Sequence, residues 1–126
     1  MSNIPNPHGA AAILYCHCQY AQVVPKESKE AVLRALCASG ADFEAVADLC
    51  EMAARRDPML GRLASSGELK IAACFPRAVK GIFHQCGADL PLDQAEVLNM
   101  RTQCPAEIIE RLMSPEIVPN IPPDKA

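Results

Sequence analysis

Four short apolar runs alternate with helical patterns along the chain, and this order constrains the fold more than any other feature. The first run is continuously apolar, as are strands that are buried on both faces of a parallel sheet. The four runs cover residues 10–16, 43–49, 69–74 and 95–100. Apolar residues at helical spacing follow each run, over residues 28–40, 52–63, 76–86 and 105–113. The order predicts a single small three-layer α/β domain, a mostly parallel four-stranded sheet flanked by helices, with right-handed crossovers.

Two segments have an ambiguous pattern. In residues 43–49, Val46 interrupts the strand-like alternation, so a helix fits the composition as well as a strand does. Pro58 lies within the second helical pattern, where proline removes a backbone hydrogen bond. Either a helix begins at Asp57 and Pro58, or a longer helix that starts near Met52 is kinked there.

Length and composition fit one domain with a segment at each end. The chain has 126 residues, of which 50% are hydrophobic, so it can bury a core without a covalent staple. Only 4% of the residues are aromatic, and the predicted core is therefore aliphatic. Residues 1–9 are predicted to be a flexible lead-in, 10–113 the domain, and 114–126 an extended, mobile, proline-rich tail.

Several function classes lack their sequence signals. The net charge is −3 and no basic patch is interleaved with aromatic residues, which argues against nucleic-acid binding. The sequence has no run of eighteen apolar residues and no signal peptide, so no membrane association is expected and the predicted location is cytoplasmic. Gly-x-Ser-x-Gly, Gly-x-Gly-x-x-Gly and Walker motifs are absent, so neither a serine hydrolase nor a nucleotide-binding protein is indicated.

Five of the seven cysteines lie where the predicted strands end. In a parallel sheet the carboxyl ends of the strands share one edge, so side chains from distant parts of the sequence converge there. An odd number of cysteines in a predicted cytosolic chain favours a metal or an iron–sulfur cluster over disulfides. The five candidates for this site are Cys16, Cys18, Cys50, Cys74 and Cys104.

The five candidates differ in how strongly their surroundings indicate a ligand. Cys74 is the best placed, because the helix that begins at Pro76 presents unpaired N–H groups to a thiolate. Arg77 either adds positive charge there or is an ordinary surface residue. The other two cysteines, Cys37 and Cys86, lie within helical patterns and are predicted to pack in the core.

Three histidines complete the set of possible ligands. His17 is either a metal ligand or, more simply, a turn residue that faces solvent. His84 is expected on a helix surface and His8 in the lead-in, so no histidine is positioned as a base for a cysteine nucleophile.

Four motifs together resemble the N-terminal domain of the heterodisulfide reductase A subunit family. They are Leu-Tyr-Cys-His-Cys at 14–18, Asp-Leu-Cys at 48–50, Ile-Ala-Ala-Cys-Phe-Pro-Arg at 71–77 and Asn-Met-Arg-Thr-Gln-Cys at 99–104. Their order and spacing match over roughly residues 12–104. The chain departs from the family pattern at Gln19, where the family has glycine. It departs again at residues 105–107, Pro-Ala-Glu, where the family has aromatic residues and histidine.

The resemblance implies a 4Fe–4S cluster that is held by cysteines and transfers electrons. It assigns ligand roles to Cys50, Cys74 and Cys104 and to one of Cys16 and Cys18, of which Cys18 is the expected ligand because it lies nearer the turn. The family's flavin-binding domain has no counterpart in this sequence. The resemblance therefore predicts an electron carrier or a small subunit of a redox complex, with redox proteins or a flavoprotein as partners, rather than a complete enzyme.

Two other functions fit the same cysteines. Four thiolates also form a tetrahedral zinc site, although the Cys-x-x-Cys knuckles typical of structural zinc sites are absent. A thiol redox sensor would instead use exposed cysteines of low pKa.

Overall fold

The computed structural model describes residues 12–17, 25–40, 43–65, 67–91, 93–114 and 116–121. The lead-in, Cys18 and Gln19 lie outside these ranges. The four strands are β1 (Ala12–Cys16), β2 (Glu44–Val46), β3 (Leu69–Ala73) and β4 (Ala95–Asn99). The helices are α1 (Lys26–Ser39), α2 (Leu49–Ala54), α3 (Pro58–Ala64), α4 (Pro76–Gln85) and α5 (Pro105–Met113).

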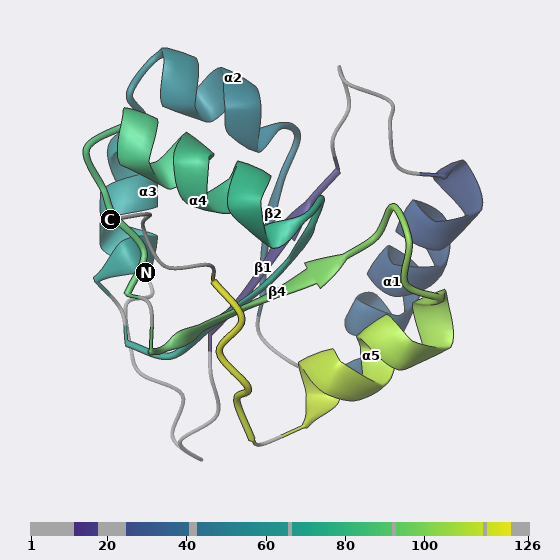
Figure 1. The fold of residues 1–126 in the computed structure, drawn as a ribbon. Helices are drawn as coiled ribbons and strands as arrows, with labels where there is room; N and C mark the ends of the chain where they lie inside the picture. The colour runs from purple at the N-terminus through teal and green to yellow at the C-terminus, as the bar shows by residue number, and fades with distance from the viewer. Residues whose placement is uncertain are drawn as a thin grey trace.

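The strands form one parallel sheet in the order β2-β1-β3-β4, which confirms the predicted α/β domain. Helices α1 and α5 pack together on one face, and α4 packs with α2 and α3 on the other (Figure 1). Right-handed crossovers require this division, because the chain moves one way across the sheet from β1 to β2 and the opposite way from β2 to β4. Within the described ranges, no helix has the length and apolar character that a bilayer span requires.

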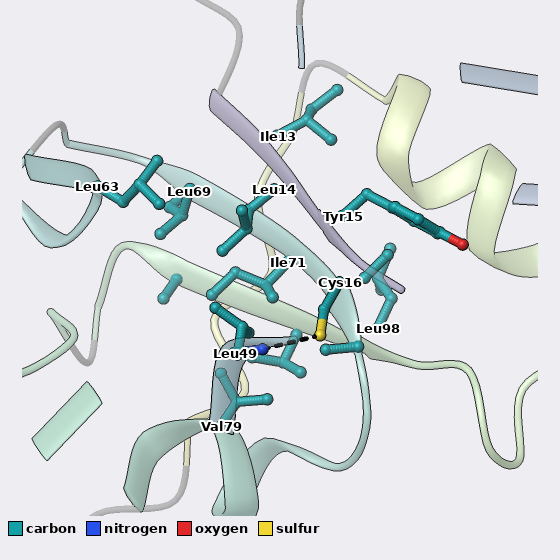
Figure 2. Packing of buried hydrophobic residues seen from close by; sticks show 14 of the residues in the cluster. Ile13, Leu14, Tyr15, Cys16, Leu49, Leu63, Leu69, Ile71, Val79 and Leu98 are labelled. Carbon is teal, nitrogen blue, oxygen red and sulfur yellow. Dashed lines mark hydrogen bonds between the residues drawn. The ribbon is translucent and has the colours of Figure 1, made fainter. Parts of the chain in front are cut away.

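Strands β1, β3 and β4 are buried on both faces, as their apolar runs predict, whereas β2 is largely exposed. Leu14, Ile71 and Val97 lie at the centre of the sheet and are at most 1% exposed. Side chains alternate along β1, so that Leu14 and Cys16 face α2 and α4 whereas Tyr15 faces α1 and α5 (Figure 2). Each fully buried aliphatic side chain contributes about 2 kcal/mol of transfer free energy to this core.

The ambiguous second run divides into a short strand and the start of a helix. β2 has only three residues, and α2 begins at Leu49 because the Asp48 carboxylate caps its first turn. Pro58 begins α3 with Asp57 as its N-cap, so the prediction of a helix start there is confirmed. Cys50 therefore lies in the first turn of a helix and not at the end of a strand.

Among the buried charged residues, Lys70 and Glu96 come from neighbouring strands of the sheet. Lys70 on β3 is 1% exposed and Glu96 on β4 is 4% exposed. The Glu96 carboxylate accepts two hydrogen bonds from the Arg111 guanidinium of α5, at 2.8 and 2.9 Å. The Lys70 ammonium lies 4.0 Å from Glu96 Oε1 and donates to the carbonyl oxygens of Arg111 and Ser114. Burial is tolerated because each charge has a partner of opposite sign.

Candidate metal centre at the carboxyl edge of the sheet

The strand order creates a switch point between β1 and β3. The chain leaves β1 towards one edge of the sheet and leaves β3 towards the other, and in such sheets the crevice outside the two carboxyl ends is the usual ligand site. Cys16 is the last residue of β1, and Cys74 follows β3 directly. The fold thus brings these two predicted site residues to the position where a parallel sheet binds ligands.

Cys16 is held in place by the first residue of α2. Cys16 is 2% exposed, and its side chain points towards α2. Its Sγ accepts a hydrogen bond of 3.3 Å from the Leu49 backbone N–H (Figure 2). N–H groups in the first turn of a helix have no partner within that helix. The donor from Leu49 therefore favours negative charge on the Cys16 sulfur.

Cys50 joins the same site from the first turn of α2. Asp48 Oδ1 accepts hydrogen bonds from the Cys50 and Glu51 N–H groups, at 2.9 and 3.3 Å, and so fixes this turn. Cys50 is exposed as a whole residue, yet partial burial of its thiol raises its pKa. The Asp48 carboxylate and the thiolates of Cys74 and Cys16 raise that pKa further. The charges of Cys74 and Cys16 thus act on the Cys50 thiol.

Cys74 completes a group of three, which we call the thiol trio: Cys16, Cys50 and Cys74. Burial raises the pKa of Cys74, and the nearby Cys16 raises it further. The backbone N–H groups of Cys74 and Phe75 and the charge of Arg101 act in the opposite direction without cancelling the increase. The negative charges of these thiolates oppose one another, which favours the neutral thiol form of Cys50 and Cys74.

The positively charged residue that acts on Cys74 is Arg101, for which the sequence predicted no role at this site. The Arg101 guanidinium lies 5.4 Å from the centre of the Phe75 ring, at a cation–π distance. Arg77, for which the sequence left two roles open, is exposed and is not among the main causes of the Cys74 pKa shift. A hollow of about 450 Å³ adjoins this pair and is lined by Pro25, Phe75, Asn99, Arg101 and Thr102.

The last motif builds a turn that ends at Cys104. Asn99 Oδ1 accepts a hydrogen bond of 3.0 Å from the Arg101 N–H, and Gln103 Oε1 accepts one of 2.6 Å from the Asn99 N–H. The side chains of Asn99 and Gln103 thus stabilise the backbone of this turn. The same turn carries Arg101, whose guanidinium lies over the Phe75 ring. A sequence signal for this role existed, because Asn side chains commonly bond the backbone two residues on.

Cys104 itself is less clearly part of the group. It is the exposed N-cap residue of α5, which lies on the face of the sheet opposite to α2. The main causes of the pKa shifts of Cys50 and Cys74 include no contribution from Cys104. Of the five predicted site cysteines, Cys16, Cys50 and Cys74 are linked by electrostatic interactions, Cys104 is not among the main causes of either pKa shift, and Cys18 lies outside the described residues.

The two cysteines assigned to the core have different environments. Cys86 packs partly against the core and its thiol lies 3.8 Å from the Asp57 carbonyl oxygen, in line with a structural role. Cys37 is exposed, so the prediction that it packs in the core is wrong. α1 buries Lys29, Val32 and Leu36, and one residue further along the helix Cys37 is turned by about 100° away from that face.

The described histidines do not join the trio. His17 Nδ1 lies 2.9 Å from the Tyr15 hydroxyl, on the face of the sheet opposite to Cys16, and His84 is an exposed residue paired with Asp89 at 2.7 Å. In the part of the chain that the structure describes, no three His, Cys, Asp or Glu side chains form a group with the geometry of a metal site. The trio therefore has the donor chemistry of a thiolate metal site but not its geometry in this structure.

Comparisons of the chain with protein-family models, with curated proteins and with solved structures find no match in any of the three. The fold and the thiol trio thus define the class: a small α/β protein with a cysteine group at the switch point of its sheet.

Proposed function

We propose that the protein is a small electron-transfer protein that holds a 4Fe–4S cluster at the switch point of its sheet. The observation that carries the proposal is the convergence of Cys16, Cys50 and Cys74, which lie far apart in the sequence, at the carboxyl ends of β1 and β3. A 4Fe–4S cluster uses thiolate ligands and would supply one-electron transfer there. The fourth ligand comes from Cys18 or Cys104.

The surroundings of the trio support a cluster more than a thiol redox sensor. Reactive cysteines have lowered pKa values, whereas those of Cys50 and Cys74 are raised. Hydrogen bonds to sulfur are among the means by which proteins tune cluster potentials, and the Leu49 N–H already donates to Cys16 Sγ. The chain's own part in the chemistry would be to hold the sulfur atoms, donate to them and exclude water on the Cys16 side.

The site differs from the ligand set inferred from the sequence in one respect. The turn argument favoured Cys18 over Cys16, but the Cys16 thiol interacts electrostatically with both Cys50 and Cys74, which supports Cys16. We therefore propose Cys16 as a ligand. A redox protein or a flavoprotein subunit would exchange electrons at this edge, where Phe75 is 38% exposed.

Anaerobic preparation with a cysteine series tests this function. The wild-type protein is expected to be brown, with about four irons per chain and a cluster signal in its EPR spectrum. Changing Cys16, Cys50 or Cys74 to serine should remove most of the iron, whereas Cys37→Ser, an exposed cysteine on α1, should retain it. Comparing Cys18→Ser with Cys104→Ser identifies the fourth ligand. A colourless wild-type protein that takes up no iron on reconstitution would refute the proposal.

Zinc is the second candidate, because three or four thiolates fit it equally well in chemical terms. Metal analysis by mass spectrometry separates the two. Stoichiometric zinc that survives anaerobic reconstitution with iron and sulfide would establish the zinc site instead.

A further inference from the structure

The hollow beside Arg101 has no role in the proposed cluster site. Its volume is about 450 Å³, and it lies at the carboxyl end of β4, whose last residue is Asn99. Small-molecule sites occupy roughly 300–1,000 Å³, and in parallel sheets ligands bind outside the carboxyl ends of the strands. The described residues that line the hollow are Pro25, Phe75, Asn99, Arg101 and Thr102. Its size and position are therefore those of a ligand site.

The polar side chains of the hollow offer hydrogen-bond donors. The Arg101 guanidinium has donors alone, and no carboxylate pairs with it among the residues that the structure describes. Asn99 uses its Oδ1 to accept from the Arg101 backbone N–H, whereas its Nδ2 donates to no described residue. Thr102 adds a hydroxyl group. None of the described lining residues is acidic, so the hollow suits an anion rather than a cation.

The Arg101 side chain is held in position by its neighbours. The turn that carries it is closed by the Asn99 carbonyl oxygen, which accepts from the N–H groups of Thr102 and Gln103 at 3.2 and 2.9 Å. The guanidinium carbon lies 5.4 Å from the centre of the Phe75 ring. Because these contacts restrict the side chain, less conformational freedom is lost when a ligand binds.

Two helix starts at the hollow favour the same charge. Pro25 and Phe75 are the N-cap residues of α1 and α4, and neither makes a side-chain cap hydrogen bond. In α2 and α3, by contrast, the carboxylates of Asp48 and Asp57 cap the first turn. The positive end of a helix dipole stabilises an anion, so α1 and α4 add to the effect of Arg101.

We propose that the hollow binds a small organic anion, with its carboxylate or phosphate group on Arg101 and its apolar part beside Phe75 and Pro25. The guanidinium matches both oxyanions, because its N–H groups can form paired parallel hydrogen bonds. Phe75 is 38% exposed and offers an apolar contact. A volume of about 450 Å³ leaves room for an apolar body as well as the charged group. The inference is independent of the proposed cluster, since none of the thiol trio lines the hollow.

Nuclear magnetic resonance titration of the full chain tests the proposal. The ¹⁵N-labelled protein is titrated with phenyl phosphate and with benzoate, against sodium chloride of equal ionic strength. Saturable shifts are expected for the amides of residues 99–103 and for the first turns of α1 and α4, and the tighter ligand identifies the preferred oxyanion. Arg101→Gln should weaken binding about tenfold, because the charge-assisted hydrogen bonds are lost. Arg101→Lys keeps the charge without the paired donors and should weaken it about threefold.

Arg77→Gln is the matched control. Arg77 is exposed at the start of α4, carries the same charge as Arg101 and is not among the residues that line the hollow. Its loss should change the affinity by no more than about twofold, because exposed charges act weakly at a distance. Inorganic phosphate, which lacks the apolar part, should bind about fivefold more weakly than phenyl phosphate.

Three outcomes would overturn the proposal. The absence of saturable shifts with both ligands would show that the hollow binds neither anion. Equal weakening in Arg77→Gln and Arg101→Gln would show that net charge attracts the ligand without a defined site. Inorganic phosphate that binds as tightly as phenyl phosphate would refute the apolar contact.

Discussion

At the scale of single residues, Glu96 is a buried carboxylate that connects β4 to β3, to α5 and to residue Val118. It accepts hydrogen bonds from Arg111 and from the Val118 N–H and lies beside the Lys70 ammonium. Burial works to raise the pKa of Glu96, but the hydrogen bonds and the two positive charges outweigh it and lower the pKa from 4.5. Burial lowers the pKa of Lys70, against the attraction of Glu96. The pair is stable because both charges are retained together.

The lowered pKa of Glu96 makes stability depend on acidity. Below pH 4.5 the unfolded chain protonates its glutamate before native Glu96 does, so the free energy of unfolding falls as the pH falls through the native pKa. At pH 7 the free energy of unfolding of Glu96→Gln should be about 3 kcal/mol lower than that of the wild type, because Lys70 loses its buried partner. On acidification the free energy of unfolding of the variant should fall less than that of the wild type. Urea unfolding at neutral and acid pH measures both effects.

A surface carboxylate provides the control for Glu96. Glu110 is exposed on α5, and Glu110→Gln should change the free energy of unfolding by no more than about 0.5 kcal/mol. Equal acid dependence in Glu96→Gln and the wild type would show that another group causes the loss at low pH.

At the scale of elements, the short helices α2 and α3 are both capped by an aspartate, but the two caps differ in what they position. Asp48 Oδ1 accepts from the N–H groups of Cys50 and Glu51 in α2, and Asp57 Oδ1 accepts from the Met59 N–H in α3. Only α2 carries a member of the thiol trio and donates to another through Leu49. The Asp48 cap therefore positions the proposed site as well as the helix.

The two caps form a matched pair of variants. Asp48→Ala and Asp57→Ala should each lower the free energy of unfolding by about 1 kcal/mol. Only Asp48→Ala should also reduce the iron retained after anaerobic reconstitution, because it releases the turn that holds Cys50. Iron content and urea unfolding of the two variants are the measurements. Equal iron retention would indicate that the cap acts on stability alone.

At the scale of the whole molecule, the thiol trio exists only in the folded chain. Its members come from β1, from α2 and from the connection after β3, and a strand order of β2-β1-β3-β4 is needed to unite them. A ligand that binds the native state alone stabilises it according to its affinity and concentration. Metal binding at the proposed site would therefore be coupled to folding.

Reconstitution should raise resistance to unfolding. We expect the loaded protein to unfold at higher urea than the metal-free protein, with a gain of about 2 kcal/mol or more. In the Cys74→Ser variant, the reconstituted and the metal-free protein should unfold at the same urea concentration. Circular dichroism under anaerobic conditions measures this, and equal midpoints for loaded and metal-free wild type would place the bound iron outside the folded site.

The sequence by itself determined most of the elements, because their signals are local, but it left β2 and α2 ambiguous. Pro76 in the first turn of α4 and Gly87 just after its end, at a φ of 79°, act within a few residues of their own positions. The apolar runs likewise predict β1, β3 and β4 closely, and the alternation of strands and helices predicts the parallel sheet. The turn role of Asn99 was readable for the same reason.

Tertiary structure alone decided which side chains meet. The sequence could not show that Cys16 faces α2 beside Cys50 and Cys74, that Cys37 lies on the exposed side of α1, or that Lys70 and Glu96 are buried as a pair. Each outcome depends on strand order, on register and on which face of an element is covered, and these are set by contacts between residues far apart in the chain. Asn120 is the clearest case, because its carboxamide acquires a role only through the N–H and carbonyl groups of Val97 that it pairs.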